Sequence, residues 1–251
     1  MKFKVVSLNI WLGGTLFEAA FDFLNKESPD IIALQEVCNG KSSNLEKRYR
    51  TLDVLRTELR YDYASFAPAF SEKIKEGMIE RGNAILSRFP IIAEKTVFYD
   101  VPYSNNYILP IEGPFHMPRN LQQAVLKTED NEFNVFNTQG IWGFDGKDTE
   151  RRLEMGKTIV NEIKDKKNVI LAGDFNIDPD TKTIAGIEQY LKNVFKNELT
   201  TTFNMKHKDR PGYATAVADM IFVSKNIKIN EHYCPRVDIS DHLPLVCVLE
   251  I

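Results

Sequence analysis

Residues 168–176 read NVILAGDFN, an apolar run that ends at the polar pair Asp174 and Asn176. Runs of this length that are rich in Val and Ile are typical of buried strands. Two earlier runs end in the same way, since KFKVVSLN stops at Asn9 and DIIALQE stops at Glu36. The sequence therefore predicts three buried strands that each end in a side-chain carboxylate or amide.

The last apolar run reverses this order, because Asp241 and His242 stand directly before LPLVCVLEI. Polar oxygens at strand ends can converge on one rim of a sheet. Mg²⁺ prefers such oxygen ligands and keeps several waters of its own. We therefore expect a divalent-cation site to which distant parts of the chain contribute.

Composition limits the class of protein. The 251 residues are 43% apolar and 27% charged, which suffices for one large domain or two small ones. No stretch approaches the roughly 20 apolar residues that cross a membrane, and no charged leader with a cleavable apolar core precedes the first strand. We expect a cytoplasmic protein without membrane contact. The net charge of −3 argues against non-specific nucleic-acid binding but does not exclude a nucleic-acid substrate.

Predicted strands and helices alternate along the chain. Strands are predicted at residues 3–9, 31–36, 84–87, 91–101, 122–128, 132–138, 168–173, 220–224, 228–234 and 245–251. Helices are predicted at residues 16–26, 44–60, 149–164 and 180–195, the third capped by Asp148. Segments 61–82 and 102–120 lack clear periodicity and are predicted to be long loops over a functional face. These patterns indicate two packed sheets flanked by helices, and periodicity alone leaves a three-layer α/β fold open.

Six short motifs follow one another along the chain: SLNIW, LQEV, GNAILSRFPI, GDFN, ADMIFVS and SDHLPL. Together they resemble the endonuclease/exonuclease/phosphatase superfamily, and the likeness spans essentially the whole chain. GDFN alone would carry little weight, whereas chance matches to six motifs would have to keep both order and spacing. The resemblance implies a single domain over residues 1–251 with a DNase I-like fold. That fold is a four-layer α/β/β/α sandwich of two mixed sheets flanked by helices, and its implied activity is divalent-cation-dependent phosphoester hydrolysis.

The resemblance assigns the metal ligands. Glu36 resembles the family's main Mg²⁺ ligand, Asn9 helps to hold metal or phosphate, and Asp241 completes the metal shell. Mn²⁺ is an alternative ion for the same oxygen ligands. Taken alone, Glu36 could instead form a salt bridge with an arginine, because an unpaired buried carboxylate is costly.

The resemblance also assigns the residues that act on the phosphate. Asp174 is the expected partner of the attacking water, and Asn176 should hydrogen-bond a phosphate oxygen. His242 would contact the phosphate, while Asp219 resembles the aspartate that orients this histidine. Whether Asp174 or His242 is the base stays open. Without the other motifs, Asp174 and Asn176 would be read as an Asx turn, and Asp219 as the cap of its strand.

One departure from the family pattern concerns phosphate binding. Many members have Thr-His-Leu where residues 138–140 of this chain read Thr-Gln-Gly. Gln139 can donate a hydrogen bond but cannot become cationic, and charge-assisted bonds are roughly twice as strong as neutral ones. We therefore expect weaker phosphate stabilisation or a compensating cation, for which Arg119 is the candidate. Asn83 and Trp142 are further candidates for substrate contact, although Trp142 could equally pack as a core aromatic.

Two charged stretches are expected to face solvent. Arg151 and Arg152 stand at the start of a predicted helix and are expected to be solvated there. The run KHKDR at residues 206–210 could meet a nucleic-acid backbone, but a charged loop is the safer interpretation.

The expected function is a Mg²⁺-dependent phosphoesterase that acts on phosphodiester bonds as a monomer, with nucleic acid as its substrate. Exonuclease III-type repair enzymes usually show Tyr-x-Pro near position 139, which this chain lacks. DNA or RNA end processing, general nuclease action and hydrolysis of a small phosphorylated substrate all stay open. A catalytically weak binding module with the same fold is the remaining alternative, and Gln139 is its support.

Overall fold

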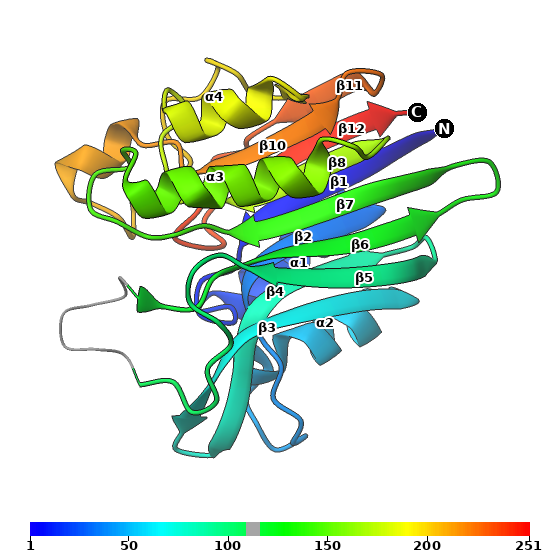
Figure 1. Cartoon of the computed structure of the whole chain (residues 1–251). Helices are drawn as coiled ribbons and strands as arrows, with labels where there is room; N and C mark the ends of the chain where they lie inside the picture. Colours follow the sequence, from blue (N-terminus) through cyan, green and yellow to red (C-terminus); the bar gives the residue numbers. More distant parts are fainter. Residues whose placement is uncertain (109–115) are drawn as a thin grey trace.

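The computed structural model describes residues 1–108 and 116–251, whose strands form two six-stranded sheets (Figure 1). The first sheet has the order β11 (Lys228–Tyr233), β12 (Leu245–Glu250), β1 (Lys2–Asn9), β2 (Ile31–Cys38), β4 (Gly77–Ser87), β3 (Tyr63–Ile74). The second sheet has the order β5 (Ile91–Phe98), β6 (Asn120–Lys127), β7 (Glu132–Gln139), β8 (Val169–Asp174), β10 (Asp219–Ser224), β9 (Leu191–Asn193). Each sheet contains one parallel pair, β1 with β2 and β7 with β8, among antiparallel pairs. Both sheets are therefore mixed, as predicted.

Helices cover the outer face of each sheet (Figure 1). They are α1 (Phe17–Glu27) and α2 (Thr51–Glu58) on the first sheet, and α3 (Glu150–Ile163) and α4 (Lys182–Glu188) on the second. Leu24 of α1 packs in one cluster with Leu34 of the first sheet, and Ile159 of α3 packs with Leu171 of the second. Four layers result, which confirms the predicted α/β/β/α sandwich. Each helix in the described ranges is too short or too polar to cross a membrane.

The inner faces of the two sheets form one apolar core. Val5 and Ile31 of the first sheet meet Val135 and Ile170 of the second, and all four are fully buried. Strands that are covered on both faces carry continuous apolar runs rather than alternating ones. The apolar runs that end at Asn9, Glu36 and Asp174 therefore belong to central strands, namely β1, β2 and β8.

Strand register brings distant polar residues together. β12 runs antiparallel to β1 with Leu245 opposite Ser7, so the segment before β12 lies beside the end of β1. β10 runs antiparallel to β8 with Asp219 directly opposite Asp174. These pairings place four chain segments at one edge of the sandwich.

The predicted loop at residues 61–82 is wrong, because β3 and half of β4 form a long antiparallel hairpin there. β3 is the edge strand of its sheet, and its register against β4 shifts between Pro68 and Phe70. Edge strands tolerate proline, bulges and polar residues. The apolar periodicity of this segment is therefore too weak to reveal a strand.

The second predicted loop, at residues 102–120, is described only in part. Residues 109–115 lie outside the described residues. Ser104 forms an isolated bridge with Phe70, and β6 begins at Asn120.

Two helices are shorter than predicted. Within residues 44–60, a 3₁₀ helix, η1 (Lys47–Arg50), precedes α2. Within residues 180–195, α4 ends at Glu188 and the chain then enters β9. Pairing of β9 with β10 decides this segment, because tertiary contacts override local helix preference.

The predicted cap of the third helix is also wrong. Thr149, not Asp148, caps α3, since its side chain accepts from the backbone N–H of Arg152. Asp148 instead accepts from the backbone N–H groups of Lys182 and Thr183 at 2.7 and 3.1 Å. It therefore ties the start of α4 to the start of α3.

Candidate functional site

The ends of β1, β2 and β8 meet at one edge of the sandwich. Asn9 at the end of β1 donates from Nδ2 to Glu36 Oε1 and to Asp174 Oδ2, both at 3.1 Å. Glu36 belongs to the first sheet and Asp174 to the second. One amide therefore joins the two sheets at the point where both present a carboxylate.

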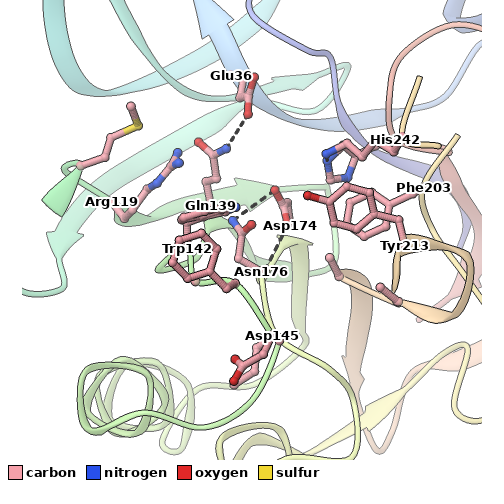
Figure 2. Close-up of a pocket in the computed structure, with 18 of the residues that line it drawn as sticks. Glu36, Arg119, Gln139, Trp142, Asp145, Asp174, Asn176, Phe203, Tyr213 and His242 are labelled. Carbon is pink, nitrogen blue, oxygen red and sulfur yellow. Dashed lines mark hydrogen bonds between the residues drawn. The ribbon is translucent and has the colours of Figure 1, made fainter. Parts of the chain in front are cut away.

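A β-bulge in β2 aims Glu36 into the site. The register of β2 against β4 shifts between Leu34 and Val37, and Glu36 has a φ of 61°. A non-glycine residue in this left-handed region costs energy and tends to mark a functional position. Glu36 Oε1 also accepts from Gln139 Nε2 at 2.8 Å (Figure 2). Its Oε2 accepts from the backbone N–H of Leu12, also at 2.8 Å.

These contacts keep Glu36 ionised. Burial of the carboxylate acts to raise its pKa. The hydrogen bond from Leu12, the charge of Arg119 and the amide of Asn9 outweigh burial, and the pKa of Glu36 is lowered. The site therefore presents a permanent negative charge at neutral pH.

Gly173 allows β8 to deliver Asp174. Its φ is +151°, and a Cβ there would lie 2.1 Å from the Thr138 carbonyl oxygen, so larger residues do not fit. Asn176 donates from its backbone N–H to Asp174 Oδ1 at 3.0 Å, which is the Asx turn considered from the sequence. Burial raises the pKa of Asp174, which makes it a better proton acceptor than an ordinary aspartate.

His242 and Asp219 form a buried pair next to Asp174. His242 donates from Nδ1–H to Asp219 Oδ2 at 2.8 Å. Burial and the charge of Lys208, whose Nζ lies 3.1 Å from Nε2, act to lower the pKa of His242, but the carboxylates of Asp219 and Asp174 outweigh them and raise the pKa to about 9. This imidazole therefore carries a proton at neutral pH.

Asp241 lies beside this pair. Its Oδ2 is 3.2 Å from Lys208 Nζ. The preceding Ser240 donates from Oγ to the Asn9 carbonyl oxygen at 2.6 Å. This bond ties the segment that carries Asp241 and His242 to the end of β1.

A cavity of about 830 Å³ opens over these groups (Figure 2). Seven of the eleven predicted site residues line it, namely Glu36, Arg119, Gln139, Trp142, Asp174, Asn176 and His242. Arg119 is 8% exposed, and its Nε has no hydrogen-bond partner within the described residues. Trp142 is half-buried, and its ring packs edge-on against Phe144 with centroids 5.1 Å apart. An unused buried donor above carboxylates is an arrangement suited to an incoming anion.

The other four predicted residues do not line the cavity. Asn9 and Asp219 each hydrogen-bond a lining residue, and Asp241 is ion-paired to one. Asn83 is buried and donates from Nδ2 to Asn120 Oδ1 at 2.9 Å. Because these two asparagines come from different sheets, Asn83 joins the sheets rather than facing the cavity.

Arg152 contradicts its predicted exposure, since it is only 1% exposed. Its Nε donates to the Ile141 carbonyl oxygen at 3.0 Å and its Nη2 to that of Asn176 at 2.7 Å. The guanidinium therefore holds a cavity loop against the GDFN turn. The sequence carried a signal for this role, because Arg152 shares the spacing of Met155 and Ile159 on the buried face of α3.

Among the wall residues that the sequence analysis did not assign to the site, three lie next to one another. Phe203, Lys208 and Tyr213 line the cavity beside His242. The charged run at residues 206–210 is a loop, as predicted, but Lys208 is half-buried in it. Loops lack the periodicity that reveals the buried face of a helix or strand, so the sequence pattern does not predict that Lys208 turns inward.

Two groups of side chains at this edge carry ligand types that a divalent cation can use, although the amide oxygen of Asn9 already accepts from the backbone N–H of Trp11 at 3.0 Å. Glu36 and Asp241 offer carboxylate oxygens and Asn9 an amide oxygen, which are the ligand types that Mg²⁺ prefers. Asp174, Asp219 and His242 form a second group, whose ligand atoms lie within 4.8 Å of one another. Both groups therefore offer ligand types that a divalent cation can use, and in the second group the Nδ1 contact with Asp219 leaves Nε2 of His242 as the ligand atom.

Solved structures resemble this fold at low sequence identity. An endonuclease/exonuclease/phosphatase from Beutenbergia cavernae superposes with a TM-score of 0.76 at 18% identity, covering 100% of this chain and 72% of that one. A mannosyl-6-phosphatase from Bacteroides thetaiotaomicron gives 0.66 at 17% identity, with coverages of 99% and 100%. TDP2 of D. rerio, complexed with single-strand DNA product, gives 0.69 at 15% identity, with coverages of 100% and 99%. At these identities the likeness shows the fold alone.

The family is established by comparison of the sequence with a family profile. No curated protein matches the chain. The profile of the Endonuclease/Exonuclease/phosphatase family, by contrast, matches residues 6–242, which is nearly the whole chain. The chain therefore belongs to the Endonuclease/Exonuclease/phosphatase family, whose members are typically hydrolases that act on phosphoester bonds.

Proposed function

We propose that this protein is a divalent-metal-dependent phosphoesterase, with residues 1–251 acting as one domain. The observation that carries the proposal is the position of Asn9 Nδ2, 3.1 Å from the carboxylates of both Glu36 and Asp174. Two carboxylates held this close repel each other unless a cation or a proton compensates them. Beside a cavity lined by Arg119 and His242, this favours a site for a metal ion and a phosphate.

Glu36, Asp241 and Asn9 would hold Mg²⁺, with Mn²⁺ as the alternative ion. When bound, such an ion neutralises the phosphate and stabilises the charge that develops on its oxygens. The lowered pKa of Glu36 keeps its carboxylate available for this role.

The residues of the second sheet would act on the phosphate and the water. Asp174, with its raised pKa, accepts a proton from the attacking water. Asn176 donates a hydrogen bond to a phosphate oxygen. His242, held by Asp219 and protonated at neutral pH, contributes positive charge to the phosphate. Of the two candidates for the base, these pKa directions favour Asp174.

The substrate we propose first is a nucleic acid, cleaved at a phosphodiester bond. Arg119 and Gln139 would contact the phosphate, and the half-buried ring of Trp142 offers a surface on which a base could stack. The similar fold of TDP2, solved with a single-strand DNA product, supports this choice.

One observation favours a second candidate, a small phosphorylated substrate. Three other basic residues of the cavity wall are already ion-paired, Arg81 with Glu72, Lys147 with Asp178 and Lys208 with Asp241. They leave little free positive charge for the backbone of a polymer. The similar fold of a mannosyl-6-phosphatase supports this alternative.

A substrate panel tests the proposal. Labelled DNA, RNA, 5′-tyrosyl-linked DNA, inositol phosphates and hexose phosphates are incubated with the protein and Mg²⁺ or Mn²⁺. We expect hydrolysis of at least one of them, abolished by EDTA and by Glu36→Gln. Glu76→Gln, at an exposed position in the β3–β4 turn, is the matched control and should keep full activity.

Absence of turnover on the whole panel with either ion would reject the enzyme and favour the binding module. A titration of Mg²⁺ against the melting temperature separates the remaining cases, because a metal that binds the folded state raises its stability. Stabilisation that is lost in Glu36→Gln supports the assigned metal site. The monomeric state stays a prediction, which light scattering of the purified protein checks.

A further inference from the structure

Lys208 is a half-buried lysine in the wall of the cavity. Its Nζ lies 3.2 Å from Asp241 Oδ2 and 3.1 Å from His242 Nε2, and its side chain is 21% exposed. An ammonium group is strongly hydrated and rarely withdrawn this far without a partner. The fold therefore places a cation directly beside the residues that we assign to the phosphate.

The backbone around Lys208 is fixed to the site. Its N–H donates to the Asn204 carbonyl oxygen at 3.0 Å. Asn204 in turn donates from Nδ2 to the Ser240 carbonyl oxygen and from its backbone N–H to that of Asp241, both at 2.9 Å. This turn is consequently bound to the segment that carries His242, so the cation is positioned before any ligand arrives.

Two aromatic rings hold the ammonium group in place. Lys208 Nζ lies 4.4 Å from the centroid of Phe203 and 5.6 Å from that of Tyr213. Both rings stand beside His242 in the cavity wall (Figure 2). Cation–π contacts of this kind restrict a flexible side chain without neutralising its charge. An ammonium group has three N–H donors, so Lys208 can keep its ion pair with Asp241 and still donate to an anion in the cavity.

A phosphate bound in the cavity would require positive charge near Gln139. Gln139 is neutral, and its amide already donates to Glu36. Among the described residues that line the cavity, Arg81 and Lys147 are engaged by carboxylates outside the reacting centre. Arg119 interacts electrostatically with Glu36 and Asp174, and Lys208 lies beside Asp241 and His242.

We propose that Lys208 is a phosphate-binding residue, whose Nζ donates to a non-bridging oxygen of the scissile phosphate. The proposal rests on the phosphoesterase function proposed above and deepens it. Lys208 supplies the charge-assisted hydrogen bond that Gln139 cannot, and such a bond is roughly twice as strong as a neutral one. The ligand class is any phosphoester or free phosphate that presents an anionic oxygen at this position.

The test compares Lys208→Met with Lys206→Met. Lys206 lies in the same loop and pairs with Asp238, but its side chain is 70% exposed and outside the cavity lining. On a substrate that the wild type cleaves, Lys208→Met should lower kcat/KM and raise the Ki of inorganic phosphate by roughly 10- to 100-fold each, as expected for a hydrogen bond to a charged group. Lys206→Met should match the wild type, and Lys208→Arg should recover part of the loss.

A second readout separates phosphate binding from a merely structural role. If Lys208 only neutralises Asp241, Lys208→Met shifts the Mg²⁺ concentration for half-maximal activity and leaves the Ki of phosphate unchanged. That result, or an equal effect of Lys206→Met, overturns the proposal while the phosphoesterase function stands.

Direct binding keeps the two proposals distinguishable. Calorimetric titration of wild type and Lys208→Met with inorganic phosphate in the presence of Mg²⁺ requires no turnover. Weaker binding by Lys208→Met supports the assignment even if no panel substrate is cleaved, which would reject the catalytic function alone. Equal affinities, or no phosphate binding by the wild type, overturn the assignment of Lys208.

Discussion

Two histidine–aspartate pairs of this protein have the same length and different surroundings. His242 lies 2.8 Å from Asp219, and His207 lies 2.8 Å from Asp238. The first pair is 4% and 3% exposed, whereas the second is 25% and 41% exposed. The two contacts are therefore equally long, but one pair is buried in the site and the other lies on the surface outside it.

The pKa shifts found in the two pairs have different causes. In the buried pair, burial opposes the charged imidazole, but the neighbouring carboxylates prevail and raise the pKa of His242 to about 9. In the surface pair, the hydrogen bonds from His207, Lys206 and Asn204 lower the pKa of Asp238 to about 2. The lesson is that contact length alone does not identify a functional ion pair, since low dielectric surroundings give the same contact greater weight.

The largest difference between the pairs is expected in activity when each histidine is replaced. His242→Asn removes the charge proposed to face the phosphate and should lower kcat by about 10³-fold, within the usual range for a residue of this type. His207→Asn should leave kcat nearly unchanged. Steady-state kinetics on the best panel substrate measure both, and an equal loss in the two variants would show that the buried pair is not special.

Replacing the aspartates should give a smaller difference. Asp219→Asn leaves His242 in place but weakens its orientation and its positive charge, so we expect kcat to fall by about 10²-fold. The matched variant Asp238→Asn should retain activity, because its amide oxygen still accepts from Asn204.

The pH dependence of kcat sharpens this second comparison. Loss of the Asp219 carboxylate lowers the pKa of His242, so the limb of the profile that reports this histidine should move to lower pH in Asp219→Asn. If the pH profile of kcat is the same in Asp219→Asn as in the wild type, Asp219 does not act on His242 and only caps β10.

The smallest expected effect is on how the free energy of unfolding of the metal-free protein depends on pH. The folded pKa of His242, about 9, lies above its ordinary value of 6.5. Its contribution to stability is therefore fully present below about pH 6.5 and lost as the pH rises through about 9. Asp238 behaves oppositely, because its folded pKa of about 2 lies below the ordinary 3.8, and its contribution is lost as the pH falls through about 2.

Melting temperatures measured in EDTA check these signs. Asp219→Asn should lose part of the stability that wild type shows at neutral pH relative to pH 10. Asp238→Asn should change only the acid limb, and only slightly, because the pair is exposed. A basic limb that is unchanged in Asp219→Asn would contradict the assigned pKa of His242.

Much of the fold was predictable from local patterns. The runs that end at Asn9, Glu36 and Asp174 belong to central strands, and their double burial makes them uniformly apolar. The hairpin at residues 61–82 was missed because edge strands carry a weak pattern. Polar residues at strand ends were found for a related reason, since each interrupts a strong apolar run.

The site was predictable only in part. Arg152 was misjudged because its charge suggested solvent, although its helical spacing pointed to the core. Lys208 belongs to a charged run that was expected to face solvent, because its partial burial depends on Phe203, Tyr213 and the segment before β12. Asn83 was assigned to the substrate from a motif, whereas its amide spans the two sheets.

By itself, the sequence determined the chemical types available, the order of the apolar runs and, through six motifs, the family. Only the tertiary structure decided which of two equally short histidine–aspartate pairs is buried and which loop lysine faces the cavity. The physical reason is that apolar patterns act over a few neighbouring residues, whereas burial and electrostatic environment arise from contacts between segments far apart in the chain.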